Sequence, residues 1–159
     1  IVKMMSKLNL DFQFDIYGDG NQKQKIQEFI SKNPHTKIKF HGSIPKADLQ
    51  LILGQYHYSF VPLVTDIKGA FPSKIFELIM HQVPVIYIGD GEAKEYLISK
   101  NLGYCLHPDE INKLPSLIST IFNLHKKNHK TLVNNCKITL KKDLNFNIQF
   151  TKFLKFLNE

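Results

Sequence analysis

Short apolar segments alternate with stretches of helical apolar spacing over residues 10–106. Five segments have the length and the branched or aromatic content typical of strands. They lie at 12–17, 37–40, 58–63, 83–88 and 103–106. The stretches between them with the apolar spacing of a helix are 21–32, 45–53, 72–81 and 92–100. This alternation predicts βαβ units, and therefore an α/β fold with a parallel sheet flanked by helices.

The chain from Pro108 onward is predicted to contain helices only. Its apolar residues at helical spacing are Leu132, Cys136, Leu140, Phe146, Phe150, Phe153 and Leu157. We expect residues 1–125 to form the α/β domain. Residues 126–159 are expected to form basic helices that pack on the same domain.

Lysine dominates the charge of the C-terminal part. The formal net charge is +7, and every cationic side chain apart from histidine is a lysine. Residues 126–155 contain many lysines and a single acid, Asp143. Two interpretations stay open: a solvated lysine face on a packed helix, or a basic amphipathic helix that contacts an anionic membrane or an acidic partner. Nucleic acid is not an expected partner, because bidentate recognition of phosphate and guanine favours arginine.

Length and composition indicate a folded domain. The chain has 159 residues, of which 43% are hydrophobic and 22% charged. No apolar run approaches the roughly 18 residues of a membrane span, and the N-terminal run is too short for a secretory signal. The chain begins at Ile1, so we expect a fragment of a longer protein. Neither the two cysteines, Cys105 and Cys136, nor the histidines show metal-ligand spacing, so no metal site is expected.

The carboxyl ends of parallel strands share one rim of the sheet, where open α/β sheets bind ligands. The loops predicted there are 18–20, 41–45, 63–72 and 89–91. The loop Gly18-Asp19-Gly20 matches neither a dinucleotide-binding fingerprint nor a P-loop. It is either a tight turn that needs glycine or part of a ligand cleft. The loop Gly89-Asp90-Gly91-Glu92 is either a turn followed by an acid in the first turn of a helix, or a contact for a hydroxyl-rich ligand.

The segment 71–77 carries more chemistry. Pro72 suits the first turn of a helix. Ser73 and Lys74 would then offer free backbone N–H groups at the partially positive helix N-terminus, where a diphosphate can bind. Glu77 lies one turn beyond Ser73, where its carboxylate can accept hydrogen bonds from a sugar or ribose diol. The alternative is that Ser73 caps the helix, Lys74 is solvated and Glu77 stabilises the helix dipole.

Four motifs, in this order, resemble the nucleotide-sugar-binding part of glycosyltransferase family 4. They are 16–20 (IYGDG), 38–45 (IKFHGSIP), 71–78 (FPSKIFEL) and 83–86 (VPVI). The PSK form of the third motif is typical of enzymes that build bacterial capsule, O-antigen or lipid-linked oligosaccharide. The pair His81-Gln82 stands where the family usually has a small residue and a glycine. We interpret this pair as variation at a helix end.

The resemblance implies a GT-B enzyme, in which two Rossmann-like domains face each other across a cleft. This chain would be most of the C-terminal, nucleotide-sugar-binding domain, and the acceptor domain would lie outside it. The binding residues carried over from the family are Gly18, Asp19, Gly20, Ile44, Phe71, Ser73, Lys74 and Glu77.

The same resemblance assigns a part of the donor to several of these residues. The backbone N–H groups of Ser73 and Lys74 would meet the diphosphate. Glu77 would hold the ribose, and the main chain at Ile44 would meet the base. The first carboxylate of the family's E-x7-E pair would fall on Gly69, so that sugar contact is absent.

The resemblance implies donor binding in a retaining glycosyltransferase, with transfer from a nucleotide sugar, expected to be UDP-linked, to a glycan or lipid-linked acceptor. No metal or other cofactor is expected, because helix N-termini and cations stabilise the leaving diphosphate. No residue of this chain is expected to act as general base or nucleophile. The alternatives are a GT-B-fold sugar-nucleotide epimerase and a non-catalytic flavodoxin-like interaction module.

The expected partners are a nucleotide sugar, the acceptor domain and, through the basic helices, an anionic membrane surface. The composition is rich in Lys, Asn and Ile and contains no Arg, which indicates an AT-rich, bacterial genome. We therefore expect a cytoplasmic protein of bacterial surface-polysaccharide synthesis, with peripheral contact at the inner membrane face.

Overall fold

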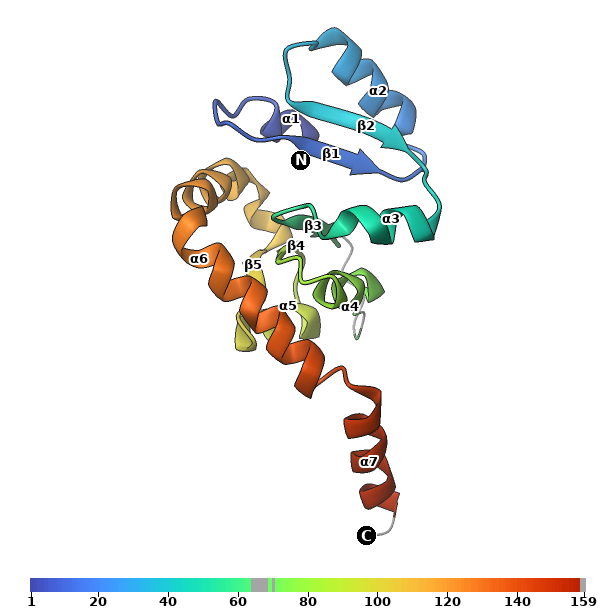
Figure 1. The fold of residues 1–159 in the computed structure, drawn as a ribbon. Coiled ribbons are helices and arrows are strands. Elements are labelled where there is room, and N and C mark those ends of the chain that lie inside the picture. The colour runs from blue at the N-terminus through green and yellow to red at the C-terminus, as the bar shows by residue number, and fades with distance from the viewer. Residues whose placement is uncertain (64–68, 70, 158–159) are drawn as a thin grey trace. The chain divides into compact units, whose positions relative to one another are not determined.

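A computed structural model of the chain describes residues 1–63, 69 and 71–157 (Figure 1). These residues form two compact units. The first unit consists of Ile1–Ile52 and Asn112–Asn123, and the second of Leu53–Ile111 and Leu124–Glu159. Within the described residues each unit has its own parallel sheet, of two strands in the first and three in the second.

The first unit is built on two parallel strands. Strands β1 (Phe14–Tyr17) and β2 (Ile38–Gly42) pair with Phe14 opposite Ile38 and with a register shift before Tyr17. The helices of this part of the chain are α1 (Val2–Met5), α2 (Lys23–Lys32) and α3 (Lys46–Leu53), the last of which ends at the start of the second unit. Ile38 and Met5 are buried, and α2 presents half-buried apolar residues but buries none completely.

The second unit contains a three-stranded parallel sheet in the order β3-β4-β5. Its strands are β3 (Ser59–Pro62), β4 (Val85–Ile88) and β5 (Gly103–Leu106). The connecting helices are α4 (Ser73–Met80) and α5 (Glu92–Ser99). All four residues of the central strand β4 are buried, as its continuous apolar sequence predicts for a strand covered on both faces.

The C-terminal part is helical. A 3₁₀ segment, η1 (Pro108–Lys113), leads into α6 (Leu114–Lys142), which is followed by α7 (Phe146–Leu157). In the second unit α6 buries Leu132, Cys136 and Thr139. The sequence pattern predicts Leu140 on that stripe; the structure buries Thr139 and leaves Leu140 half-buried. None of the described helices is both long and apolar enough to cross a bilayer.

Two helices of the second unit end in the same way. After α4, Gln82 has φ 60° and its N–H donates to Ile79 O, while Val83 N donates to Leu78 O at 2.9 Å. This pattern is a Schellman motif, in which a left-handed residue follows the helix. Asn101, with φ 49°, ends α5 in the same manner. The pair His81-Gln82 is therefore a helix end, and Gln82 adopts the conformation that usually favours glycine.

The sequence predicts the order and type of the strands and of the helices between them, with ends that differ from the structure by at most two residues. The expected α/β class with parallel strands flanked by helices is confirmed. The pattern predicts a single shared rim, whereas the described strands pair in two separate sheets. Helix α1 was not predicted, because four residues are too few to show a helical period. The expected division into an α/β domain at 1–125 and basic helices at 126–159 stays a prediction.

Candidate functional site

The start of α4 is the part of the predicted site with the clearest geometry. Pro72 is the N-cap, with an extended conformation (φ −61°, ψ 118°), and Ser73 is the first helical residue. The expectation that Pro72 lies inside the first turn is therefore wrong by one position. Ser73 is not the cap either, since Pro72 occupies that position. Both Ser73 and Lys74 are exposed.

The first backbone N–H groups of α4 precede its intrahelical hydrogen bonds. Ile75 N donates to Pro72 O at 2.9 Å, which closes the first turn. The N–H groups of Ser73 and Lys74 come before that bond and point out of the helix end. They lie where the helix carries partial positive charge, so this end is suited to an anion.

Glu77 lies one turn further along α4 and is half-buried, with its Oε1 atom shielded from solvent. This position is beyond the first turn of α4, and that first turn contains no acidic residue. The helix dipole acts mainly within the first turn, so the structure disfavours the interpretation that Glu77 serves the dipole. A carboxylate has the acceptor oxygens that the hydroxyl groups of a diol can donate to.

Phe71 fixes the direction in which the chain enters α4. Its ring stacks on that of Phe76, with centroids 4.6 Å apart and planes 13° apart. It also meets the edge of Tyr96 on α5 at 5.5 Å. A residue just before the N-cap that packs on the fourth helical residue forms a hydrophobic staple. The Phe71 side chain thus has a structural role beside the ligand contact that the sequence predicts.

The loop Gly18-Asp19-Gly20 forms a closed turn in the first unit. Gly18 has φ 131°, and its N–H donates to Gly42 O at 2.8 Å, which ties the loop to the end of β2. The Asp19 carboxylate accepts the N–H of Gly20 at 2.8 Å and contacts Lys23 Nζ at 3.4 Å. The Gly20 N–H, and then Lys23, lower the pKa of Asp19. The carboxylate is thus committed to its own loop, which favours the tight-turn interpretation.

Sequence reasoning missed a polar cluster beside this loop. His41 Nε2 lies 2.8 Å from Asp15 Oδ1, and the Asp15 side chain is only 4% exposed. Gln13 Nε2 donates to Asp15 Oδ2 at 2.7 Å, and the ring of His41 stacks on Tyr17 at 4.5 Å. These residues come from β1, β2 and the residue before β1. The predicted parallel pairing of the two strands is the one signal that could have brought Asp15 and His41 together.

The predicted site residues fall in two groups. Gly18, Asp19, Gly20 and the half-buried Ile44 belong to the first unit, and Phe71, Ser73, Lys74 and Glu77 belong to the second. Within the second unit, all four residues lie on the first turns of α4 or directly before it. The predicted rim loop 63–72 is described only at residues 63, 69, 71 and 72, and its other positions lie outside the described residues.

The loop at Asp90 also forms a local turn. Gly91 is the N-cap of α5 with φ 76°, and Lys94 Nζ lies 2.8 Å from Asp90 Oδ1. The hydrogen bond from Lys94 is the main reason that the pKa of Asp90 is lowered. His107 Nε2 is 3.4 Å from the other carboxylate oxygen. These contacts favour a structural turn over a ligand contact.

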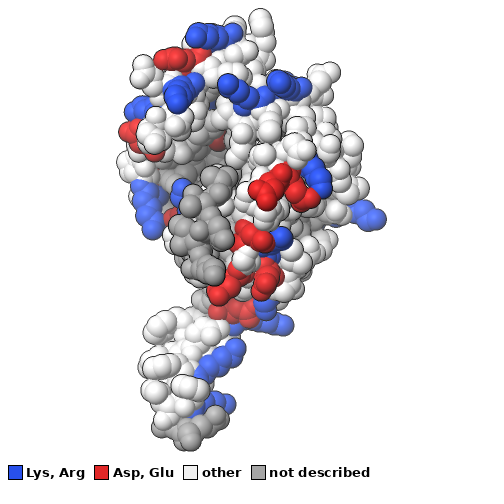
Figure 2. Space-filling model, turned by 180° about the vertical axis from the view of Figure 1, so that it is seen from behind, with Lys and Arg blue, Asp and Glu red and all other residues white. Residues whose placement is uncertain are grey.

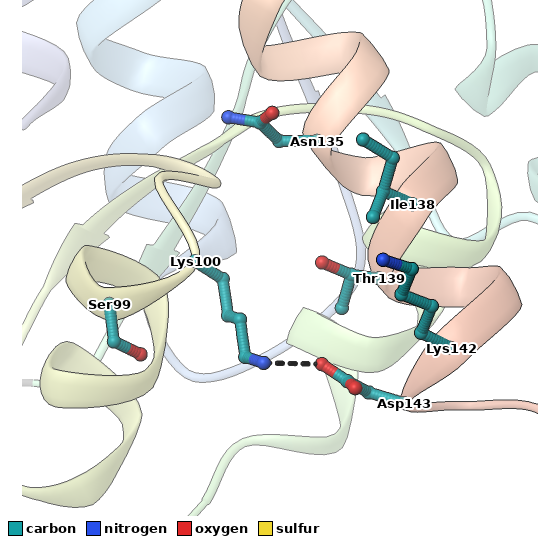
Figure 3. Close-up of a pocket in the computed structure, with 7 residues that line it drawn as sticks. All are labelled: Ser99, Lys100, Asn135, Ile138, Thr139, Lys142 and Asp143. Atoms are coloured by element: carbon teal, nitrogen blue, oxygen red, sulfur yellow. Dashed lines mark ion pairs between the residues drawn. The ribbon is translucent and has the colours of Figure 1, made fainter.

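A hollow of about 260 Å³ lies between the ends of α5 and α6 in the second unit (Figure 3). Lys100 Nζ and Asp143 Oδ2 form an ion pair at 2.7 Å across it, and this pair raises the pKa of Lys100. Asn135 Nδ2 donates to Asn101 O at 2.9 Å, which is a second link between α6 and the residues after α5. None of the lining residues belongs to the predicted site. The ion pair and the hydrogen bond connect α6 to the end of α5, so we interpret the hollow as part of the packing between these helices.

Metal ligation has no support in the geometry. Among the described residues, no three His, Cys, Asp or Glu side chains are arranged to hold a metal ion. The three histidines His57, His125 and His129 cluster in the second unit through ring contacts of 4.7 to 5.3 Å. That donor binding needs no metal stays a prediction.

Comparison with known proteins shows the family. The sequence model of the family described as glycosyl transferases group 1 matches residues 1–137. The UDP-N-acetylglucosamine--peptide N-acetylglucosaminyltransferase GtfA subunit of Streptococcus agalactiae is 30% identical over 118 residues, which are 74% of this chain and 22% of that protein.

Solved structures with the same fold are those of Anabaena Alr3699/HepE. The complex with UDP-glucose matches with a TM-score of 0.73, and the complex with UDP and glucose with 0.74, both at 18% identity. Each match covers 97% of this chain and 43% of that one. The chain therefore spans less than half the length of these relatives. Because the family model matches most of the chain, this protein belongs to the group 1 glycosyltransferase family.

Proposed function

We propose that this chain is the donor-binding part of a retaining glycosyltransferase that uses a nucleotide sugar, with the start of α4 as the diphosphate site. The observation that carries the proposal is the pairing, on one helix, of an exposed N-terminus at Ser73 and Lys74 with the half-buried carboxylate of Glu77 one turn later. The helix end suits a diphosphate and the carboxylate suits the diol of a ribose.

This arrangement assists sugar transfer by stabilising the leaving group. When the bond between the anomeric carbon and the diphosphate oxygen breaks, negative charge develops on the diphosphate. The N–H groups of Ser73 and Lys74 and the Lys74 ammonium then meet more charge than in the ground state, which lowers the barrier. Glu77 positions the nucleoside and takes no part in bond breaking. The proposal needs no bound metal, and assigns the acceptor site and the remaining catalytic groups to other parts of a longer protein.

UDP is the proposed nucleotide. The name of the Streptococcus agalactiae relative contains UDP-N-acetylglucosamine, and the Anabaena structures contain UDP-glucose or UDP. These are properties of those proteins, and they support the choice of UDP here. We further propose that the acceptor is a glycan or a lipid-linked sugar of bacterial surface-polysaccharide synthesis. The enzyme would be of the PSK type that builds capsule or O-antigen, and it would act at the cytoplasmic face of an anionic membrane.

Calorimetric titration of the chain with UDP and with inorganic phosphate tests the proposal. We expect UDP to bind more tightly than phosphate, because the ribose adds hydrogen bonds to Glu77. A Glu77→Gln variant should weaken UDP about tenfold or more, since hydrogen bonds to a charged group contribute about 1.5–3 kcal/mol. The control is Glu95→Gln, at an exposed position of α5, which should leave the affinity unchanged. Equal binding of UDP by all three proteins would contradict the proposed site.

A further inference from the structure

The buried stripe of α6 is interrupted where the helix passes from the first unit to the second. The helix buries Ile121 in its part of the first unit and Leu132 in its part of the second, and no residue from 122 to 131 is buried. Helical spacing places His125 and His129 on the stripe between them, and both are half-buried. Histidines therefore stand where an amphipathic helix usually has apolar side chains.

These two histidines contact a third, His57, which lies two residues before β3 in the second unit. The His57 ring meets the rings of His125 and His129 at 4.7 and 5.3 Å, in both cases edge to face. His129 Nε2 also lies 3.1 Å from His57 O, and the Tyr58 ring packs beside the two histidines of α6 at 5.9 and 5.4 Å. The stretch 122–131 of α6 is thus held to the start of β3 through rings that can take up a proton.

No carboxylate on α6 offsets a positive charge on this histidine cluster (His57, His125 and His129). No acid occurs from 111 to 142, and the lysines at 126, 127 and 130 are exposed next to the histidines in the sequence. Figure 2 shows acidic side chains gathered in another place, above α7. The other titratable side chains packed at the cluster are those of Tyr58 and, 6.1 Å behind it, Tyr104. Tyrosine side chains are uncharged near pH 6, so they do not offset the charge either.

We propose that the histidine cluster is a pH-sensitive contact, which holds the stretch 122–131 of α6 on the start of β3 while its rings are neutral and releases this stretch when they are protonated. Protonation would place like charges on rings that are 4.7 to 5.3 Å apart and partly withdrawn from water. Ile121 and Leu132 are buried on either side, so we expect a local opening of the stretch between them. This property goes beyond the proposed function and does not depend on the donor site on α4.

The direction of the effect agrees with the pKa values. Burial is the main cause that lowers the pKa of His125 and of His129, and neighbouring histidines lower both further. The opened stretch, in which the rings are hydrated, therefore binds more protons than the closed contact. The contact should be complete above the ordinary histidine pKa of about 6.5, and it should be lost as the pH falls through the lowered values.

Amide hydrogen exchange of the whole ¹⁵N-labelled chain tests the proposal. Protection factors, corrected for intrinsic exchange, are compared at pH 7.5 and pH 5.5. We expect the protection of residues 126–131 to fall about tenfold or more, because each proton taken up on opening contributes up to tenfold per pH unit. Residues 136–140, which include the buried Cys136 and Thr139, should stay better protected than 126–131 at both pH values.

Two double variants and one control assign the effect to the cluster. His125→Gln with His129→Gln keeps polar side chains but removes the titration, so the pH difference at 126–131 should nearly disappear. His125→Leu with His129→Leu completes the apolar stripe, so it should fold and stay protected at both pH values. His35→Gln removes an exposed histidine of the first unit and should keep the full pH difference.

Two results would overturn the proposal. Equal protection of 126–131 and 136–140 at both pH values would mean that the stretch opens only when the whole unit unfolds. A pH difference in the leucine variant as large as that of the unchanged chain would assign the effect to groups outside the cluster.

Discussion

The ring of Phe71 stacks on the ring of Phe76, 4.6 Å away, and thereby fixes where α4 begins. Because the proposed diphosphate site is the start of that helix, this contact links folding to binding. Phe71→Ala should lower the free energy of unfolding by about 1–3 kcal/mol through the lost burial and the lost aromatic pair. It should also weaken UDP binding, because the first turn of α4 is no longer held.

The measurement is chemical denaturation, followed by UDP titration under conditions where the variant is folded. Phe71→Leu keeps an apolar contact with Phe76 and should lose less than half as much in both measurements. If Phe71→Ala unfolds at the same denaturant concentration as the unchanged chain, the staple does not contribute to stability.

Gln82 offers a stabilising substitution. It has φ 60° at the end of α4, a conformation that costs about 1–2 kcal/mol for residues other than glycine. Gln82→Gly removes this strain and makes the unfolded chain more flexible, so we expect a net gain of roughly 0.5–1 kcal/mol. The thermal unfolding midpoint should rise by about 1–4 °C in calorimetry. A lower midpoint would show that the Gln82 side chain contributes more than its backbone conformation costs.

Gly103 of β5 pairs with Val85 of β4. A Cβ atom at this position would run into the backbone of Val85, including its carbonyl oxygen. Backbone atoms in a central strand cannot move aside, so Gly103→Ala should lower the free energy of unfolding by about 2 kcal/mol or more. Gly54→Ala is the matched control, because that glycine faces open space and has no unusual φ. Equal denaturation midpoints for the two variants would refute the packing argument.

The pH dependence of stability should report the histidine cluster. Burial is the main cause that lowers the pKa values of His125 and His129, and neighbouring histidines lower them further. The folded state therefore binds fewer protons than the unfolded chain near pH 6. The free energy of unfolding should have its full value above the ordinary histidine pKa of about 6.5. It should fall as the pH drops through the lowered pKa values of the folded state.

Thermal unfolding between pH 7.5 and 5 measures this effect. His129 Nε2 faces the carbonyl of His57 at 3.1 Å, so this nitrogen carries the proton of the neutral ring. A double variant, His125→Gln with His129→Gln, should show a flatter profile over this range. A profile as steep as that of the unchanged chain would assign the pH dependence to other groups.

The sequence predicts the elements of the fold because each carries its own periodic pattern. The continuous apolar run at 83–88 identifies β4 as a buried strand, and the alternation at 37–40 identifies β2. Helix α1 has no such pattern. On α6, helical spacing allows either Thr139 or Leu140 on the buried stripe, and the structure buries Thr139. The pairing of strands in two sheets depends on contacts far apart in the chain.

The candidate site shows the same limit. The helix start at 72–74 and the place of Glu77 one turn later follow from local sequence rules, and the structure has both. The staple of Phe71 on Phe76 also follows a local rule, since the two residues flank the helix start at the positions of a hydrophobic staple. The hydrogen bond between Asp15 and His41 joins residues 26 positions apart, so only the pairing of β1 with β2 reveals it.

Backbone amide NMR can show whether the first N–H groups of α4 bind a diphosphate. In a titration of the ¹⁵N-labelled chain with UDP, we expect the amide signals of Ser73 and Lys74 to be among those that shift most. Inorganic phosphate should move the same signals only at higher concentration. If UDP binds and these two signals stay in place while others shift, the diphosphate does not bind at the start of α4.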